Sequence, residues 1–160
     1  MVWIGLISTL FVILFMIVII DTYHLRIPNS LNLTLFATGL FYAHFNDGFS
    51  VLTQACFSIA IFLFFTVLRW IYFKLRNKSG LGFGDVKMFA AAGVWIDPMS
   101  FPILMLIASG AALTYFTLAH VLFSKHIASH TRLPFGPFIA VALLMVVVVE
   151  QNDLLEGIFL

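Results

Sequence analysis

Long runs of apolar residues, separated by short polar or charged stretches, make up most of the chain. Six such runs can be marked, near residues 2–20, 30–46, 51–73, 85–96, 99–123 and 134–149. Several of them approach the roughly 20 apolar residues that an α-helix needs to cross the hydrocarbon core of a bilayer. The pattern predicts an all-α, polytopic membrane protein with six transmembrane helices.

The composition leads to the same prediction. Hydrophobic residues make up 62% of the chain and charged residues only 9%, and a soluble fold of this size has too little polar surface to cover so much apolar side chain. The length of 160 residues predicts one domain, residues 1–160. The first run lacks a basic n-region and an A-x-A cleavage site, so we expect a spanning helix there rather than a signal peptide.

The basic residues are distributed unevenly along the chain. All eight lie in or beside the connections after the first, third and fifth runs: Arg26, Arg69, Lys74, Arg76, Lys78, Lys87, Lys125 and Arg132. The other connections and the C-terminal tail carry acidic residues and no basic ones: Asp47, Asp97, Glu150, Asp153 and Glu156. By the positive-inside rule, the first set of connections is predicted to be cytoplasmic and both termini to lie outside.

Two acidic residues break this pattern, Asp21 at the end of the first run and Asp85 at the start of the fourth. Both are expected near the cytoplasmic boundary, because odd-numbered runs lead inward and even-numbered runs lead outward. A carboxylate inside the membrane boundary is costly and usually serves a function. Asp21 alone could cap the interface or pair with Arg26. Two such acids on the same side favour a functional pair.

The depth of Asp85 in the bilayer does not follow directly from the spacing of the residues. The 12 residues from Asp85 to Asp97 make roughly 18 Å of helix, whereas the hydrocarbon core is about 30 Å thick. If Asp97 lies at the outer surface, Asp85 lies below the inner one, deeper than Asp21. Helix tilt or local thinning of the bilayer would reconcile the two depths.

Two close carboxylates that share a proton can activate a water and polarise a peptide carbonyl, as aspartic proteases do. Asp85 stands at a helix N-terminus, where the macrodipole favours the ionised form, and Asp21 stands at a C-terminus, where it disfavours charge. We therefore predict that Asp85 is the carboxylate and that Asp21 holds the proton. Gly82 and Gly84, just before Asp85, would leave clearance for a peptide substrate.

Three motifs resemble those of a known family. "GFGD" at residues 82–85, followed by "VK", looks like the GxGD motif of type IV prepilin peptidases, which are membrane aspartic proteases. "DTYHLRIPN" at 21–29 is similar to the family's other signature, an aspartate followed by Ile-Pro-Asn. "LPFGPFIA" at 133–140 resembles its Pro-Phe-Gly-Pro segment before the last helix. The motifs occur in the family's order and extend over most of the chain.

The resemblance implies an enzyme of the inner membrane that removes the short basic leader of a prepilin at the cytoplasmic face, with Asp21 and Asp85 as the catalytic pair. Larger members of the family carry two Cys-x-x-Cys pairs and N-methylate the new N-terminus. This sequence has one cysteine, Cys56. It therefore resembles the short, peptidase-only type of tight-adherence pilus systems, and we expect no N-methylation. Presenilin-type proteases fit less well, because Ile20 rather than tyrosine precedes Asp21.

The remaining polar residues are weaker candidates for a functional role than the two acids. Lys87 either extends its ammonium group to the interface or meets an acidic group of the pair or of the substrate, and is a candidate for substrate binding. His126 and His130 are four residues apart, but no third ligand accompanies them, so we predict no metal site. We expect no cofactor and no nucleic-acid partner; the expected partners are the prepilin and the bilayer, and the sequence predicts no particular oligomeric state.

Two other classes of function compete with the enzyme. Intramembrane aspartates also relay protons in small proton-coupled transporters, and a pilus or secretion assembly can contain non-enzymatic membrane components. A transporter would more naturally place its acids near the midplane and show two matched halves. No internal repeat is visible in the sequence. The glycine-rich stretch and the paired acids on one side favour the peptidase.

Overall fold

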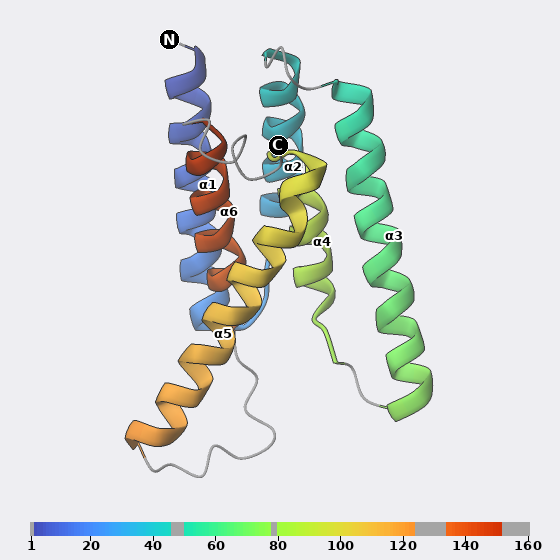
Figure 1. Ribbon diagram of the computed structural model, residues 1–160, viewed down its shortest axis with the longest axis vertical. Helices are drawn as coiled ribbons and strands as arrows, with labels where there is room; N and C mark the ends of the chain where they lie inside the picture. Colours follow the sequence, from blue (N-terminus) through green and yellow to red (C-terminus); the bar gives the residue numbers. More distant parts are fainter. Residues whose placement is uncertain (1, 46–49, 78–79, 124–133, 152–160) are drawn as a thin grey trace.

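In the computed structural model, the described residues are 2–45, 50–77, 80–123 and 134–151. Their elements are α1 (Val2–His24), α2 (Asn29–Phe45), α3 (Val51–Arg76), α4 (Phe83–Ala92), the 3₁₀-helix η1 (Pro98–Ser100), α5 (Phe101–Phe123) and α6 (Gly136–Gln151). Successive helices alternate in direction, and α5 crosses the others obliquely (Figure 1). The all-α class predicted from the sequence is confirmed for this part of the chain.

Three of the helical segments are long and apolar enough to cross a membrane. They are Gly5–His24, Val51–Arg76 and Pro98–Val121, and α6 is a shorter apolar helix. These three segments match the predicted spanning helices in length and apolar character. Six crossings, and the placement of both termini outside, remain predictions.

The fourth apolar run differs from its prediction. Helix α4 has 10 residues, which make about 15 Å of helix, half of the hydrocarbon core. Residues 93–97 after it form a turn rather than more helix. Helix α4 contacts α2, α3 and α6, and Val86 and residues 88–96 are buried. The run at 85–96 is therefore a short, enclosed helix followed by a buried turn, rather than one continuous spanning helix.

A helix that ends inside the protein leaves its last four carbonyl groups without partners in the helix. In α4 all four are satisfied. The N–H groups of the turn reach three of them: Gly93 donates to Phe89 at 3.0 Å, Val94 to Ala91 at 3.4 Å and Trp95 to Ala92 at 3.0 Å. The hydroxyl of Ser58, from α3, donates to the fourth, the Ala90 carbonyl, at 2.6 Å. The early end of α4 thus leaves no unpaired carbonyl in the core.

The buried turn after α4 is held by two further side chains. Gln54 of α3 donates through Nε2 to the Ile96 carbonyl at 3.0 Å. Trp95 donates through Nε1 to the Leu35 carbonyl of α2 at 2.9 Å and stacks on Tyr42 with ring centroids 5.0 Å apart. Polar bonds across buried helix surfaces fix the register of neighbouring helices. Helix α4 is therefore tied to both α2 and α3.

The acidic residues Asp97 and Glu150 meet where the turn after α4 reaches the end of α6. The Asp97 N–H donates to Glu150 Oε1 at 3.0 Å, and the Asp97 side chain accepts from the Met99 N–H at 2.7 Å. Asp85 lies in the first turn of α4, and Gly136 begins α6. Asp97 and Glu150 therefore lie near the opposite ends of these two helices.

Replacement of Ser58 by alanine tests the anchoring of α4. Ser58→Ala leaves the Ala90 carbonyl without a donor in a buried site, so we expect a loss of about 1 kcal/mol of stability. Ser109→Ala is the matched control, since the Ser109 hydroxyl only bonds back to its own exposed helix. Equilibrium unfolding in detergent measures both variants, and equal stability of the two would contradict the anchoring role.

Candidate active site

Asp21 lies in the last turn of α1, and the end of that helix is well defined. Leu25 adopts a left-handed conformation with φ of 52°, and its N–H donates to the Asp21 carbonyl at 2.9 Å. Such a residue commonly ends a helix, and Pro28 cannot continue it. Although the end of α1 is otherwise exposed, Asp21 itself is buried, with 4% of its surface accessible. The carboxylate therefore points into the helix bundle.

The start of α6 supplies a hydrogen-bond donor to this carboxylate. The Gly136 N–H donates to Asp21 Oδ2 at 2.9 Å. A Cβ atom on Gly136 would lie 2.7 Å from the same oxygen, closer than non-bonded atoms approach. Only glycine therefore allows the α6 backbone to come this near. The bond joins the first and third motifs of the sequence.

Ile27 lies between the starts of α4 and α6. A Cβ on Gly84 would lie 3.3 Å from Ile27 Cβ, and a Cβ on Gly136 would lie 3.2 Å from Ile27 Cδ1. Ile27 is itself buried. The segment after α1 therefore packs against both helix starts, and two glycines make this close approach possible.

Asp85 lies in the first turn of α4, after Gly82 as the N-cap residue. A Cβ on Gly82 would lie 2.7 Å from Asp85 Oδ2, so the carboxylate rests against the Gly82 backbone. Asp85 is close enough to Asp21 for the charge of one to act on the other. Two acids that are far apart in the sequence thus meet at one end of the bundle, where α1 ends and α4 and α6 begin.

The contacts also bear on which acid holds the proton. The Gly136 N–H donates to Asp21, and a donor to a carboxylate oxygen stabilises negative charge there. This contribution opposes the effect of the α1 C-terminus, from which Asp21 was predicted to hold the proton. The assignment of the proton to Asp21 therefore stays a prediction, and the Gly136 hydrogen bond opposes it.

The glycines of the second motif have contacts of their own. Gly82 makes room for the Asp85 carboxylate, and Gly84 makes room for Ile27. A side chain at position 82 would crowd the Asp85 carboxylate, and one at position 84 would crowd Ile27. Packing within the site therefore accounts for both glycines. Clearance for a substrate peptide remains a prediction for Gly82 and Gly84.

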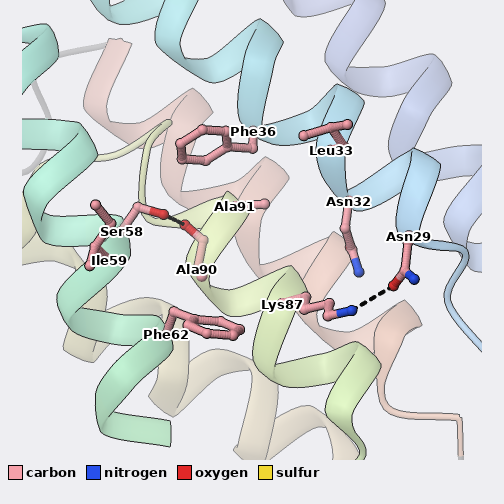
Figure 2. Close-up of a pocket in the computed structure, with 10 residues that line it drawn as sticks. All are labelled: Asn29, Asn32, Leu33, Phe36, Ser58, Ile59, Phe62, Lys87, Ala90 and Ala91. Atoms are coloured by element: carbon pink, nitrogen blue, oxygen red, sulfur yellow. Dashed lines mark hydrogen bonds between the residues drawn. The ribbon is translucent and has the colours of Figure 1, made fainter. Parts of the chain in front are cut away.

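Lys87 does not contact either acid. Its Nζ donates to Asn29 Oδ1 at 2.7 Å (Figure 2) and lies 4.7 Å from the centroid of the Phe83 ring. Residues two positions apart on a helix point to different faces. Lys87 accordingly contacts Asn29 of α2, while Asp85 lies near Asp21 of α1. Binding of substrate by Lys87 remains a prediction.

Two residues that hold the site together were not predicted to take part in it. Gly136 was included only as part of the motif at residues 133–140, with no role of its own. Asn32 was not singled out, yet its Nδ2 donates to the Gly84 carbonyl at 3.3 Å. The available signal was its spacing: Asn32 follows Asn29 by three residues, so both lie on the α2 face that meets α4.

No group of three or more potential metal-ligating side chains occurs within residues 2–45, 50–77, 80–123 and 134–151. His126 and His130 lie outside these residues.

A sequence model described as the type IV leader peptidase family matches residues 8–118. This segment contains both Asp21 and Asp85. The chain belongs to the type IV leader peptidase family. The Gly136 contact to Asp21 comes from beyond the matched segment.

Several members of the family are similar to the chain. It is 35% identical over 120 residues to an Escherichia coli protein named type 4 prepilin-like proteins leader peptide-processing enzyme, covering 74% of this chain and 42% of that protein. It is 32% identical over 124 residues to the prepilin leader peptidase/N-methyltransferase of Aeromonas hydrophila, covering 77% and 42%. The leader peptidase HopD of Escherichia coli is 31% identical over 122 residues, covering 76% and 78%.

The chain thus spans less than half the length of the first two relatives. No solved structure matches the chain.

Substitution of Gly136 tests the contact between the start of α6 and Asp21. Gly136→Ala puts a methyl group where Asp21 Oδ2 now lies, so we expect leader cleavage to fall at least about tenfold, corresponding to 1.4 kcal/mol. Gly5→Ala, in the same helix as Asp21, is the control, because nothing lies within 4 Å of a Cβ there. Full cleavage by Gly136→Ala would show that the contact does not position Asp21.

Proposed function

We propose that the chain is a membrane-embedded aspartic endopeptidase with Asp21 and Asp85 as its catalytic pair. The observation that carries the proposal is that α1 and α4 place two carboxylates close together, one of them buried and bonded to the backbone of α6. Intramembrane acids are costly and usually functional. Membership of a leader peptidase family supports the same chemistry.

The pair would act as one acid and one base. The ionised carboxylate takes a proton from a water as that water attacks the scissile carbonyl carbon. The protonated partner donates a hydrogen bond to the carbonyl oxygen, and a proton then passes to the leaving amine. The Gly136 N–H would hold Asp21 in orientation through this cycle. Because the two acids interact, they titrate as a pair.

The substrate we propose is a type IV prepilin of the tight-adherence type, whose short basic leader is removed without N-methylation. Family membership supports the leader as the part removed. The sequence contains a single cysteine, Cys56, and so lacks the two Cys-x-x-Cys pairs that the resemblance described in the sequence analysis associates with N-methylation. Residues 1–160 would act as one domain.

We also propose that the helices make six crossings of the inner membrane, with both termini outside and the acids toward the cytoplasm. The distribution of the eight basic residues supports this orientation. Arg26 follows Asp21 closely, and Lys74 and Arg76 lie in the last turn of α3. The alternating helix directions fit the same arrangement (Figure 1).

Incubation of the purified protein in detergent with a tight-adherence prepilin tests the proposal. Asp21→Asn and Asp85→Asn should each reduce leader removal by about 10³-fold or more, since each variant lacks one half of the acid–base pair. Asp97→Asn is the matched control, because asparagine can keep the cap at η1. Mass spectrometry of the product should show the new N-terminus unmethylated when S-adenosylmethionine is present.

Leader removal that survives both substitutions would reject the aspartic mechanism. A loss as large in Asp97→Asn would show that the assay reports general damage to the fold. A methylated product would reject only the absence of N-methylation.

A further inference from the structure

A groove lies between α2, α3 and α4, on the face of α4 that points away from Asp85. Its volume is about 480 Å³. Its apolar wall comes from all three helices (Figure 2): Leu33, Phe36, Ile59, Phe62, Ala90 and Ala91. The small side chains of α4 leave the space, and α2 and α3 flank it.

The groove opens to the outside of the helix bundle. Leu33 is 67% exposed and Ile59 is 56% exposed, one on each side of the opening. On a bundle embedded in a bilayer, such exposed apolar side chains face lipid chains rather than water. Whatever enters the groove along this wall must therefore be apolar.

One end of the groove is polar and basic. Lys87 lies there, bonded to Asn29, and Asn29 is the first residue of α2. This end is therefore level with the helix ends, at the side where the acids Asp21 and Asp85 also lie. A polar head group at the membrane boundary can therefore reach Lys87, while the apolar chain attached to it lies along the apolar wall of the groove.

A second cation, Arg69, contacts the same aromatic ring as Lys87. The Arg69 guanidinium lies 5.2 Å from the centroid of the Phe83 ring, and Lys87 Nζ lies 4.7 Å from the same centroid. Arg69 Nε is buried and has no hydrogen-bond partner in the described part of the chain. In that part of the chain neither cation forms an ion pair with a carboxylate. Two uncompensated cations near the membrane boundary are expensive unless an anion joins them.

We infer that this groove binds one anionic phospholipid, with the phosphate at Lys87 and Arg69 and an acyl chain along the apolar wall. The phosphate would accept hydrogen bonds from the Arg69 guanidinium, whose Nε has no partner within the described residues, and from the Lys87 ammonium group. The size of the groove favours a lipid chain over a substrate helix. An α-helix about 10 Å wide fills roughly 400 Å³ per turn, so the groove has room for little more than one turn.

The lipid site is separate from the proposed catalytic pair. Asp85 lies near Asp21 of α1, whereas the groove is lined by Lys87, Ala90 and Ala91 of α4 and does not include Asp85. A bound chain would fill space against Ala90 and Ala91 and would thus support the short helix that carries Asp85. The inference does not depend on the peptidase activity, so its test does not require a prepilin.

Native mass spectrometry of the full chain in detergent tests the site, with phosphatidylglycerol and phosphatidylcholine as probes. We expect the protein to retain one phosphatidylglycerol in preference to phosphatidylcholine. The double variant Lys87→Gln and Arg69→Gln should bind phosphatidylglycerol about tenfold more weakly or worse, since two charge-assisted contacts are lost. The control removes the same charge from the end of α3, through Lys74→Gln and Arg76→Gln, and should bind as the wild type does.

A second variant tests the acyl chain without touching the charges. Ile59→Trp fills the groove from an exposed position of α3 and should also weaken phosphatidylglycerol binding. Equal weakening in the Lys74→Gln, Arg76→Gln control would overturn the site in favour of general surface attraction. Undiminished binding by Ile59→Trp, or full displacement of the lipid by inorganic phosphate, would overturn it in favour of a simple phosphate site. Retention of the lipid by the Lys87→Gln, Arg69→Gln variant would overturn it as well.

Discussion

The early end of α4 is the constraint on which the rest of the structure depends. A helix that stops inside a bilayer must have its last carbonyl groups satisfied by the protein, because no water is present to do so. The turn after Ala92 satisfies three of them, and Ser58 satisfies the fourth. Gln54 and Trp95 then hold the turn itself. These bonds allow a helix of only 10 residues to stay in place with Asp85 at its start.

The position of Asp85 then depends on close packing at the other end of α4. Gly84 and Gly136 let the starts of α4 and α6 approach the segment after α1, where Ile27 is buried between them. In membranes, small residues permit such approach where no hydrophobic driving force pulls helices together. The same approach carries the Gly136 N–H to Asp21. The three motifs of the sequence thus meet at one site. The first supplies Asp21 and Ile27, the second supplies Gly84, and the third supplies Gly136.

Much of the arrangement could be predicted from the pattern of residues. The apolar runs predicted the helices. The uneven distribution of basic residues showed that Asp21 and Asp85 are the two acids that do not fit the charge pattern of the connections. The length of α4 could not be predicted in this way, because the apolar residues 93–96 after it continue the same composition although they form a buried turn. The end of α4 depends on Ser58 and Gln54, two polar residues of the third apolar run, and no local sequence pattern links these residues to α4. The role of Gly136 also depends on a contact across 115 positions.

The proposed catalytic pair requires that the end of α1 and the start of α4 bring Asp21 and Asp85 together in the membrane. Cysteine cross-linking tests it most directly, in a Cys56→Ser background with Asp21→Cys and Asp85→Cys. A short bifunctional thiol reagent should join the two positions in native membranes. The pair Asp21→Cys and Asp97→Cys, with its second cysteine at the far end of the α4 segment, should not be joined. Equal cross-linking of both pairs, or none of the first pair while each cysteine reacts singly with the reagent, would contradict the account.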